Sequence, residues 1–153
     1  MDLILWRHAE AREPREGQAD ADRPLTAKGE RHAARMAEWL NRHLPDSTRV
    51  LVSPTLRTVQ TAQAIGRKHK LIPELGPDQT VDALLSVARW PEAREPVLVV
   101  GHQYTLGLAA AYLLAGATQP WVVRRGAVWW LRMRQRETGG EVVLHAVLSP
   151  DRI

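Results

Sequence analysis

The hydrophobic residues of this chain form short continuous runs that alternate with longer stretches of helical spacing. The continuous runs lie at residues 3–6, 50–52 and 97–100, and each ends at a polar or small residue. Such runs are typical of strands that are buried on both faces, as in a parallel sheet. We therefore predict that these three segments are the central strands of the fold.

Helical patterns separate the predicted strands, and two of them have clear starting residues. Thr26 is a suitable N-cap for the first helix, because its hydroxyl can accept a hydrogen bond from a free N–H group. Ser53 and Pro54 predict the start of the second helix, with serine as the cap and proline at the first helical position. The predicted helices cover residues 26–44, 53–68, 80–90 and 105–114.

The end of the chain has a different pattern, which predicts a β-hairpin. Residues 127–133 and 142–148 are predicted strands around a turn at residues 137–141, whereas residues 9–24 are polar and predict a loop. The alternation of strands and helices before the hairpin indicates βαβ units. The predicted fold is therefore a three-layer α/β/α sandwich, with helices on both faces of a mostly parallel sheet and the hairpin at its edge.

Size and composition fit one folded domain. The 153 residues lie within the usual range of roughly 100–200, and no repeat or linker divides the chain, so we expect one domain over residues 1–153. A hydrophobic share of 44% with 25% charged residues excludes the disordered and low-complexity classes. The absence of cysteine excludes disulfides, thiolate metal ligands and a cysteine nucleophile.

Arginine dominates the positive charge of the chain. Eighteen of the 21 basic residues are arginine, yet the formal net charge is only +4. A nucleic-acid-binding protein more often concentrates its basic residues in a stripe, whereas these are scattered among acidic residues, so we expect no nucleic-acid partner. Guanidinium groups bind phosphate bidentately, which makes anion binding the functional interpretation; a GC-rich coding sequence is the simpler one.

The sequence also predicts no membrane segment. The chain begins directly with its first apolar run and lacks the basic region of a signal peptide. Its longest apolar run, at residues 106–117, is much shorter than the roughly 20 residues of a membrane-spanning helix. We therefore expect a cytoplasmic protein without a membrane partner.

Polar side chains follow each of the three predicted strands. Arg7 and His8 follow the first strand, Ser53 and Arg57 the second, and His102 the third. Ligands of open α/β sheets bind at the carboxyl ends of the strands, so we expect two histidines and two arginines at one edge of the sheet. Each of these residues alone has an ordinary structural explanation, but the four together indicate a functional site.

Four segments around these residues resemble motifs of the histidine phosphatase (phosphoglycerate mutase-like) superfamily. They are LWRHAE at residues 5–10, PLTAKG at 24–29, SPTLRTVQTA at 53–62 and VVGH at 99–102. They occur in the family's order, and the chain looks most like the bacterial phosphohistidine phosphatase branch typified by SixA. One departure is Ala9, where the family usually has a glycine, which tolerates backbone angles that alanine resists.

The resemblance implies a covalent mechanism. His8 would be the nucleophile and would form a phosphohistidine, with its other ring nitrogen held by a backbone carbonyl. Arg7 and Arg57 would hold the phosphoryl oxygens, and a cationic His102 would stabilise these oxygens further. This chemistry requires no metal and no cofactor, and the remaining histidines show no metal-ligand spacing.

The resemblance leaves the proton donor open. Superfamily members commonly use a carboxylate between the second motif and the late histidine, and Glu74 lies where this branch tends to have a PEL sequence. Asp78 and Asp82 are alternatives, Glu10 is a more remote one, and Glu74 could equally be a solvated loop residue. A phosphohistidine substrate would lessen the need for an acid, because imidazole is a better leaving group than an alkoxide.

Two pairs of neighbouring residues near the hairpin have simple interpretations. Trp129 and Trp130 are consecutive in a predicted strand, so packing on both faces of the sheet is favoured over a stacking platform for a ligand. Arg124 and Arg125 precede the hairpin and either flank the mouth of the site or face solvent, and solvent is favoured.

The favoured function is a metal-independent phosphatase that acts on phosphohistidine in a signalling protein, such as a histidine phosphorelay domain. Only 44 residues separate Arg57 from His102, which is too few for a long lid. A shallow site suits a phosphorylated protein side chain better than an enclosed sugar phosphate. A small-molecule phosphomonoesterase of the same mechanism is the nearest alternative, and a non-catalytic phosphoryl-binding module is the alternative of a different class.

Overall fold

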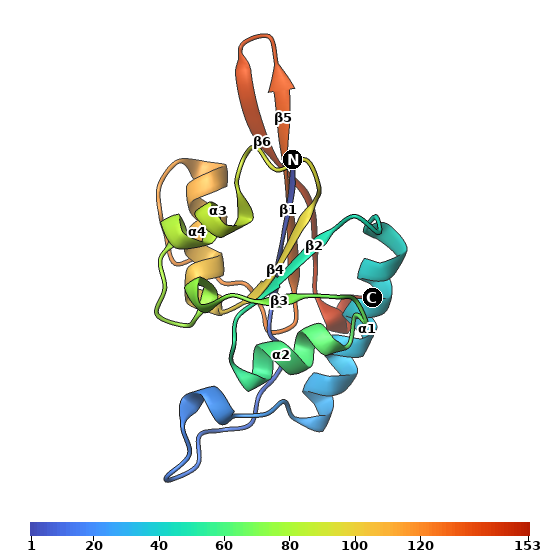
Figure 1. Ribbon diagram of the computed structural model, residues 1–153, viewed down its shortest axis with the longest axis vertical. Helices are drawn as coiled ribbons and strands as arrows, with labels where there is room; N and C mark the ends of the chain where they lie inside the picture. Colours follow the sequence, from blue (N-terminus) through green and yellow to red (C-terminus); the bar gives the residue numbers. More distant parts are fainter.

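The computed structural model describes residues 1–153, and its centre is a six-stranded sheet with helices on both faces (Figure 1). The strand order is β3-β2-β4-β1-β5-β6; the first four are parallel, and β5 and β6 are antiparallel to their neighbours. The strands are β1 (Asp2–Arg7), β2 (Arg49–Val52), β3 (Lys70–Leu71), β4 (Val97–Gly101), β5 (Val128–Arg136) and β6 (Gly139–Leu148). The helices are α1 (Ala27–His43), α2 (Leu56–Gln63), α3 (Val81–Ala88) and α4 (Gln103–Ala115). The predicted three-layer fold is confirmed.

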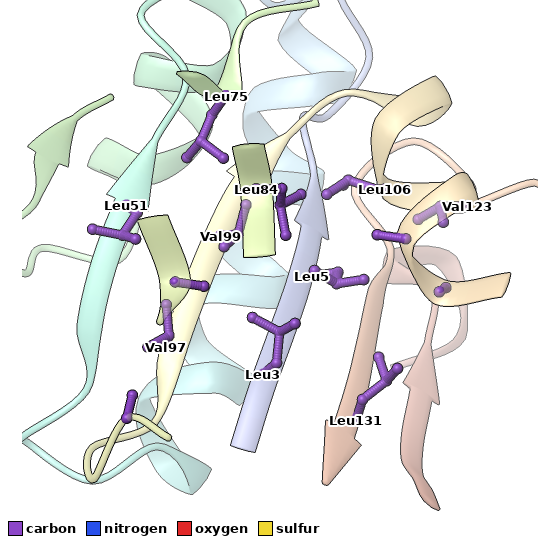
Figure 2. Close-up of a cluster of buried hydrophobic side chains, with 14 of the residues drawn as sticks. Leu3, Leu5, Leu51, Leu75, Leu84, Val97, Val99, Leu106, Val123 and Leu131 are labelled. Carbon is purple, nitrogen blue, oxygen red and sulfur yellow. The ribbon is translucent and has the colours of Figure 1, made fainter. Parts of the chain in front are cut away.

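The side chains of β1 alternate between two hydrophobic cores. Leu3 and Leu5 pack on the face of the sheet that α3 and α4 cover (Figure 2). Ile4 and Trp6 pack on the opposite face, which α1 and α2 cover. All four side chains are fully buried. Burial on both faces explains why this strand is continuously apolar in the sequence.

The first helix begins and ends where the sequence predicts. The Thr26 hydroxyl accepts a hydrogen bond from the Gly29 amide at 3.0 Å, as an N-cap does. The last helical residue is His43, and Leu44 closes the helix just before Pro45. Local sequence signals therefore determine both ends of α1.

The second helix is shorter than predicted, because Ser53 does not cap it. The Ser53 hydroxyl instead makes a 2.8 Å hydrogen bond with Nε2 of His102, and Thr55 occupies the N-cap position. The helix ends at Gln63 rather than near residue 68, and Gly66 follows with a φ of +67°. Arg57 is therefore the second residue of α2 rather than about four residues past its cap.

The C-terminal hairpin lies at the sheet edge, as predicted, but its strands are longer. Pairing extends from Val128 opposite Leu148 to Arg136 opposite Gly139, so only two residues form the turn. Gly139 has a φ of +116°, a conformation that favours glycine. The hairpin protrudes from the body of the molecule (Figure 1).

The two neighbouring tryptophans pack on opposite faces of β5, which confirms the prediction for this pair. Trp130 is buried in the core beside α1 and α2, whereas Trp129 packs against the core beside α3 and α4. Each indole therefore contributes apolar contact area to a different layer of the fold.

Three features of the remaining chain complete the fold. The two-residue strand β3 was not predicted, because both of its side chains are exposed and so short a segment has no hydrophobic pattern. The predicted loop at residues 9–24 contains a short 3-10 helix, Asp20–Asp22. None of the helices combines the length and the apolar character needed to cross a membrane.

Gly29 allows α1 to approach the segment after β1, and we predict that Gly29→Ala destabilises the protein. A Cβ atom at this position would overlap the carbonyl oxygen of Glu10, which is backbone and cannot simply rotate away. The free energy of unfolding should fall by roughly 1–3 kcal/mol, measured by urea denaturation. The control Arg31→Ala, at an exposed position of the same helix, should change it by less than about 0.5 kcal/mol. Equal effects of the two substitutions would contradict the prediction.

Candidate active site

The four residues predicted to converge do line one pocket. The cavity of about 520 Å³ includes Arg7, His8, Arg57 and His102 in its wall. Strand β1 supplies the first two residues at its carboxyl end, and His102 follows β4, which pairs with β1 in parallel. The rings of His8 and His102 lie 5.5 Å apart between their centroids.

His8 is held in one tautomer by the main chain. Its Nδ1 lies 2.8 Å from the Ala9 carbonyl oxygen, which can only accept a hydrogen bond, so Nδ1 carries the proton and Nε2 keeps a lone pair. The predicted backbone partner of His8 is therefore confirmed. Burial is the main cause that lowers the pKa of His8 to about 3; the hydrogen bond to Ala9 opposes this shift, and the charges of His102 and Arg7 contribute to it. The ring is consequently neutral at pH 7.

Ala9 is accommodated without backbone strain. Its N–H donates to the Thr61 hydroxyl at 3.0 Å, and its side chain is buried in a small cluster with Leu25 and Ala33. Arg89 is the one non-glycine residue with a positive φ, so Ala9 does not adopt a conformation that needs glycine. The departure from the family's glycine leaves the backbone beneath the pocket in an ordinary conformation.

His102 is also neutral in the environment that the protein provides. Burial is the main cause that lowers the pKa of His102 to about 4, and the positive charge of Arg57 adds to it. Its Nε2 shares a 2.8 Å hydrogen bond with the Ser53 hydroxyl. A cationic His102 therefore needs a bound anion that raises this pKa, and the cationic form beside a phosphoryl group stays a prediction.

The two low histidine pKa values predict that acid destabilises the fold well before its carboxylates titrate. An unfolded chain has histidine pKa values near 6.5, so it binds more protons than the folded protein below that pH. The stability contributed by neutral His8 and His102 is present above pH 6.5 and lost as the pH falls toward 4. The free energy of unfolding should decrease between pH 6.5 and 5, with a slope approaching about 1.4 kcal/mol per pH unit for each histidine.

Urea denaturation at pH 7, 6 and 5 measures this slope. The variant His102→Gln removes one of the two histidines with the largest shifts, and its slope should be smaller than that of the natural protein by up to about 1.4 kcal/mol per pH unit. An equal slope in both proteins would show that His102 titrates normally and would contradict the low pKa.

Arg7 carries a buried donor without a partner. Its Nη1 donates to the Val123 carbonyl oxygen at 2.9 Å, but its Nε is buried and makes no hydrogen bond. Burial lowers the pKa of Arg7 to about 10, and the nearby positive charges of Arg125 and Arg57 contribute. The guanidinium remains cationic at pH 7 and is fixed by the main chain.

Arg57 is oriented by an acidic residue that sequence reasoning did not select. Its two terminal nitrogens donate to the main-chain carbonyl and the carboxylate of Asp20, both at 2.9 Å. Burial raises the pKa of Asp20, but hydrogen bonds from Arg57 and Arg23 outweigh this and hold the pKa below its ordinary value. The Arg57 side chain is only 5% exposed, and its Nε is also buried without a partner. No local signal distinguishes Asp20 from the other acids of this polar loop.

The two orphaned guanidinium nitrogens indicate an anion site. A buried donor without a partner costs on the order of 1–3 kcal/mol, and most buried polar groups in proteins are therefore paired. Arg7 and Arg57, which carry these nitrogens, both line the pocket of His8, whose Nε2 is unprotonated. A tetrahedral oxyanion would pair with both guanidinium groups and place its central atom within reach of a nucleophile.

The structure does not bring the predicted proton donor to this pocket. Glu74 is exposed in the short 3-10 helix Pro73–Leu75 and does not line the cavity. Asp78 and Asp82 line a neighbouring hollow, while Glu10 accepts a hydrogen bond from the Thr26 hydroxyl. The carboxylate that lines the pocket of His8 is that of Glu13, which is exposed and was not predicted. The role of Glu74 stays a prediction.

Arg125 is exposed, as the preference for solvent predicts, and it also lines the pocket of His8. Its side chain is 54% exposed and lies 3.7 Å from a Glu10 carboxylate oxygen. Arg124 is exposed as predicted.

The exposed Tyr104 at the start of α4 is another residue that lines the pocket of His8, and the sequence patterns did not reveal it. No group of three or more His, Asp or Glu residues is arranged to hold a metal ion.

Comparison with known proteins decides the family of this chain. Residues 3–80, slightly more than half of the sequence, match the sequence model of the histidine phosphatase superfamily (branch 1). The chain belongs to this superfamily. The matched segment includes Arg7, His8 and Arg57. Membership of this superfamily identifies the protein as a phosphatase.

The SixA-like branch is supported by sequence and by structure. The chain is 33% identical to the phosphohistidine phosphatase SixA of Escherichia coli (strain K12) over 128 residues, which is 78% of each protein. A Nakamurella multipartitia structure assigned as a phosphohistidine phosphatase SixA has a TM-score of 0.78 and 30% identity, covering 97% of this chain and 95% of its own. The protein histidine phosphatase SixA complexed with tungstate also has a TM-score of 0.78, with 29% identity and 99% of each chain covered.

These findings confirm the resemblance stated from the sequence motifs. The histidine phosphatase has the phosphoglycerate mutase-like fold, and its pocket lies at the carboxyl ends of β1 and β4. The identity of its substrate is a separate question, because family membership covers several classes of phosphate compound.

Proposed function

We propose that this histidine phosphatase works through a covalent phosphohistidine at His8 and dephosphorylates phosphohistidine in a signalling protein. The observation that carries the chemical part is the neutral His8 ring, with its lone pair on Nε2, in one pocket with the half-buried Arg7 and the buried Arg57. A neutral imidazole is a nucleophile, whereas an imidazolium is not. The low pKa of His8 keeps nearly all of the enzyme in the reactive form at pH 7.

The reaction has two displacement steps. In the first, Nε2 of His8 forms a bond to phosphorus, and the leaving atom departs with the electron pair of its broken bond to phosphorus. In the second, water forms a bond to phosphorus, the N–P bond breaks, and the electron pair returns to Nε2 as inorganic phosphate leaves with a proton lost to solvent. The Ala9 carbonyl holds the ring in the required tautomer throughout.

Arg7, Arg57 and His102 are proposed to bind the phosphoryl oxygens. Phosphoryl transfer depends mainly on positioning and on stabilising charge, and guanidinium groups do both. Because two fixed arginines supply the positive charge, the chemistry does not call for a metal ion. The tungstate complex of the related SixA protein supports an oxyanion site, since tungstate is a tetrahedral oxyanion like phosphate. His102 would become cationic once the anion raises its pKa.

The proposed substrate is a phosphohistidine protein. The similarity of this chain to SixA proteins favours it over the other phosphate compounds named above. The absence of a buried carboxylate from the pocket wall is consistent with this choice, since an imidazole leaving group needs little help from an acid. If an acid is used, Glu74 remains our candidate, and it would have to reach the pocket from an exposed position. A histidine phosphorelay domain is the proposed partner.

We also propose that the chain acts as one domain over residues 1–153. Strands from residue 2 to residue 148 belong to one sheet, which supports this organisation. The cytoplasmic location stays a prediction.

The substrate proposal is tested by comparing a phosphohistidine-containing phosphorelay domain with a panel of sugar phosphates. The phosphorelay domain should have a kcat/KM at least about tenfold higher, because a protein substrate adds binding energy outside the phosphoryl pocket. The variant His8→Ala, assayed on each substrate, reports background hydrolysis. A preference for any sugar phosphate would overturn the substrate but leave the histidine chemistry in place.

A further inference from the structure

A second hollow adjoins the catalytic pocket. Its volume is about 360 Å³, and it shares Arg7 and Arg125 with the pocket of His8. Lys28, from the first turn of α1, forms part of its wall, together with the C-terminal 3-10 helix Pro150–Arg152. The C-terminus lies beside α1, far along the chain from β1 (Figure 1). Segments from both ends of the sequence therefore build this hollow.

The charges in this hollow are unbalanced. Its formally charged side chains are Arg7, Lys28, Arg124, Arg125, Glu10 and Asp151. The ion pairs among them are long: Arg125 lies 3.7 Å from Glu10, and Arg124 lies 3.4 Å from Asp151. Lys28 lies within 4.0 Å of no carboxylate and is exposed. Because Arg7 is assigned to the phosphoryl group, three cations remain against two carboxylates, and a net positive charge is left for a second ligand.

The arrangement of these cations is unfavourable unless an anion joins them. Arg7 and Arg125 repel each other, which contributes to the lowered pKa of Arg7 after burial. Lys28 lies in the first turn of α1, where the helix dipole disfavours a cation. An anionic group bound between Arg125 and Lys28 would be attracted to both cations and to the helix N-terminus, and these attractions would offset the two unfavourable interactions.

We propose that Lys28, Arg124 and Arg125 form a subsite, here called the Lys28 subsite, for a second anionic group of the substrate. This inference rests on the proposed function, because the first anionic group is the phosphoryl group that His8 attacks. Arg125 lines both hollows, so one substrate can contact the two sites at once. The ligand is a carboxylate or a phosphate on the leaving part of the molecule.

Two sources can supply this group. On a phosphoprotein, it is an Asp or Glu side chain beside the phosphohistidine. On a small phosphate ester, it is a carboxylate or a second phosphate of the leaving alcohol. The recognition chemistry is the same in both, and matched substrates distinguish them.

The test compares two substrates that differ by one charge. The substrates are 3-carboxyphenyl phosphate and its neutral analogue 3-carbamoylphenyl phosphate, and the quantity measured is the ratio of their kcat/KM values. In Lys28→Gln this ratio should fall about fivefold relative to the natural enzyme, as expected for one partly solvated charge pair. The ratio within one enzyme does not depend on how much of that enzyme is folded. The difference in reactivity between the two leaving groups cancels when the ratios of two enzymes are compared.

Lys70→Gln is the matched control. Lys70 is exposed on β3, at the opposite side of the sheet from the hairpin, and its replacement removes the same charge. Its ratio should equal that of the natural enzyme. Raising the salt concentration should lower the ratio of the natural enzyme toward that of Lys28→Gln, because salt screens exposed charges. A purely structural effect of Lys28→Gln would not reproduce this dependence.

The outcomes separate this inference from the proposed function. Hydrolysis of both esters with the same ratio in Lys28→Gln and Lys70→Gln would overturn the Lys28 subsite and leave the phosphatase mechanism standing. Hydrolysis that survives in His8→Ala would overturn the proposed function and, with it, the inference that rests on it.

A second pair of substrates identifies the source of the anion. Two phosphohistidine peptides carry either Glu or Gln next to the phosphohistidine, and the ratio of their kcat/KM values is measured in the same three enzymes. A fall in the peptide ratio in Lys28→Gln assigns the subsite to an acidic side chain of a protein substrate. A fall confined to the aryl esters assigns it to the leaving group of a small phosphate ester.

Discussion

His8→Ala should lower the rate of aryl phosphate hydrolysis by at least about 10⁴-fold, the size of effect seen when a covalent nucleophile is removed. The expected loss follows from the site geometry, because no other pocket residue combines a buried neutral ring with a fixed tautomer and an unprotonated nitrogen. Initial rates with a chromogenic phosphate, at saturating and at low substrate concentration, measure the loss in kcat and in kcat/KM.

A histidine outside the pocket provides the control for this variant. His43 is exposed and packs against Trp39, so His43→Ala should retain activity. In the natural enzyme, rapid acid-free quenching with radiolabelled substrate should trap acid-labile phosphate, and His8→Ala should trap none. Turnover retained by His8→Ala, or label found on a different residue, would exclude the proposed covalent step.

Arg57→Gln should have the second largest effect, a decrease in kcat/KM of about 10²- to 10³-fold. Arg57 is almost fully buried and has an unpaired Nε, so its substitution should remove the proposed charge-assisted hydrogen bond to a phosphoryl oxygen, which water cannot replace. Arg57→Lys should recover only part of this loss, since lysine keeps the charge but lacks the planar fork. Steady-state kinetics with an aryl phosphate, together with a thermal unfolding curve for each variant, measure the effect.

Arg94→Gln removes the same charge from an exposed position and should leave kcat/KM within about twofold of the natural value. A decrease in Arg94→Gln as large as that in Arg57→Gln would mean that long-range charge, rather than direct contact, controls the rate. Full activity of Arg57→Lys would likewise argue against bidentate binding by the guanidinium.

Much of the fold could be predicted because its determinants are local. The continuous apolar run of β1 requires burial on both faces, and Thr26 with Pro45 sets the limits of α1. Glycine and turn residues mark the hairpin. The short strand β3 and the true start of α2 escaped prediction, because a two-residue strand has no period and because the Ser53 hydroxyl bonds to a residue far along the chain.

Some residues of the candidate site could likewise be predicted from the sequence, and others could not. Arg7, His8, Arg57 and His102 are recognisable because each follows a predicted strand and lies in a motif of the superfamily. Asp20 was not selected from the sequence, and for Arg125 exposure to solvent was favoured over a place at the mouth of the site. Asp20 contacts Arg57 across 37 positions, and Arg125 is one of many surface arginines until the chain folds around β1.

Local sequence signals set the chain order of the helices and of every strand except β3, the caps of α1, and the four side chains expected at one edge of the sheet. These features depend on hydrophobic period and on backbone preferences within a few residues. The charge state of the site, in contrast, depends on the folded chain: it comprises the low pKa values of His8 and His102, the unpaired nitrogens of Arg7 and Arg57, and the uncompensated Lys28. Burial and the proximity of distant charges set these properties, and neither quantity exists until the chain has folded.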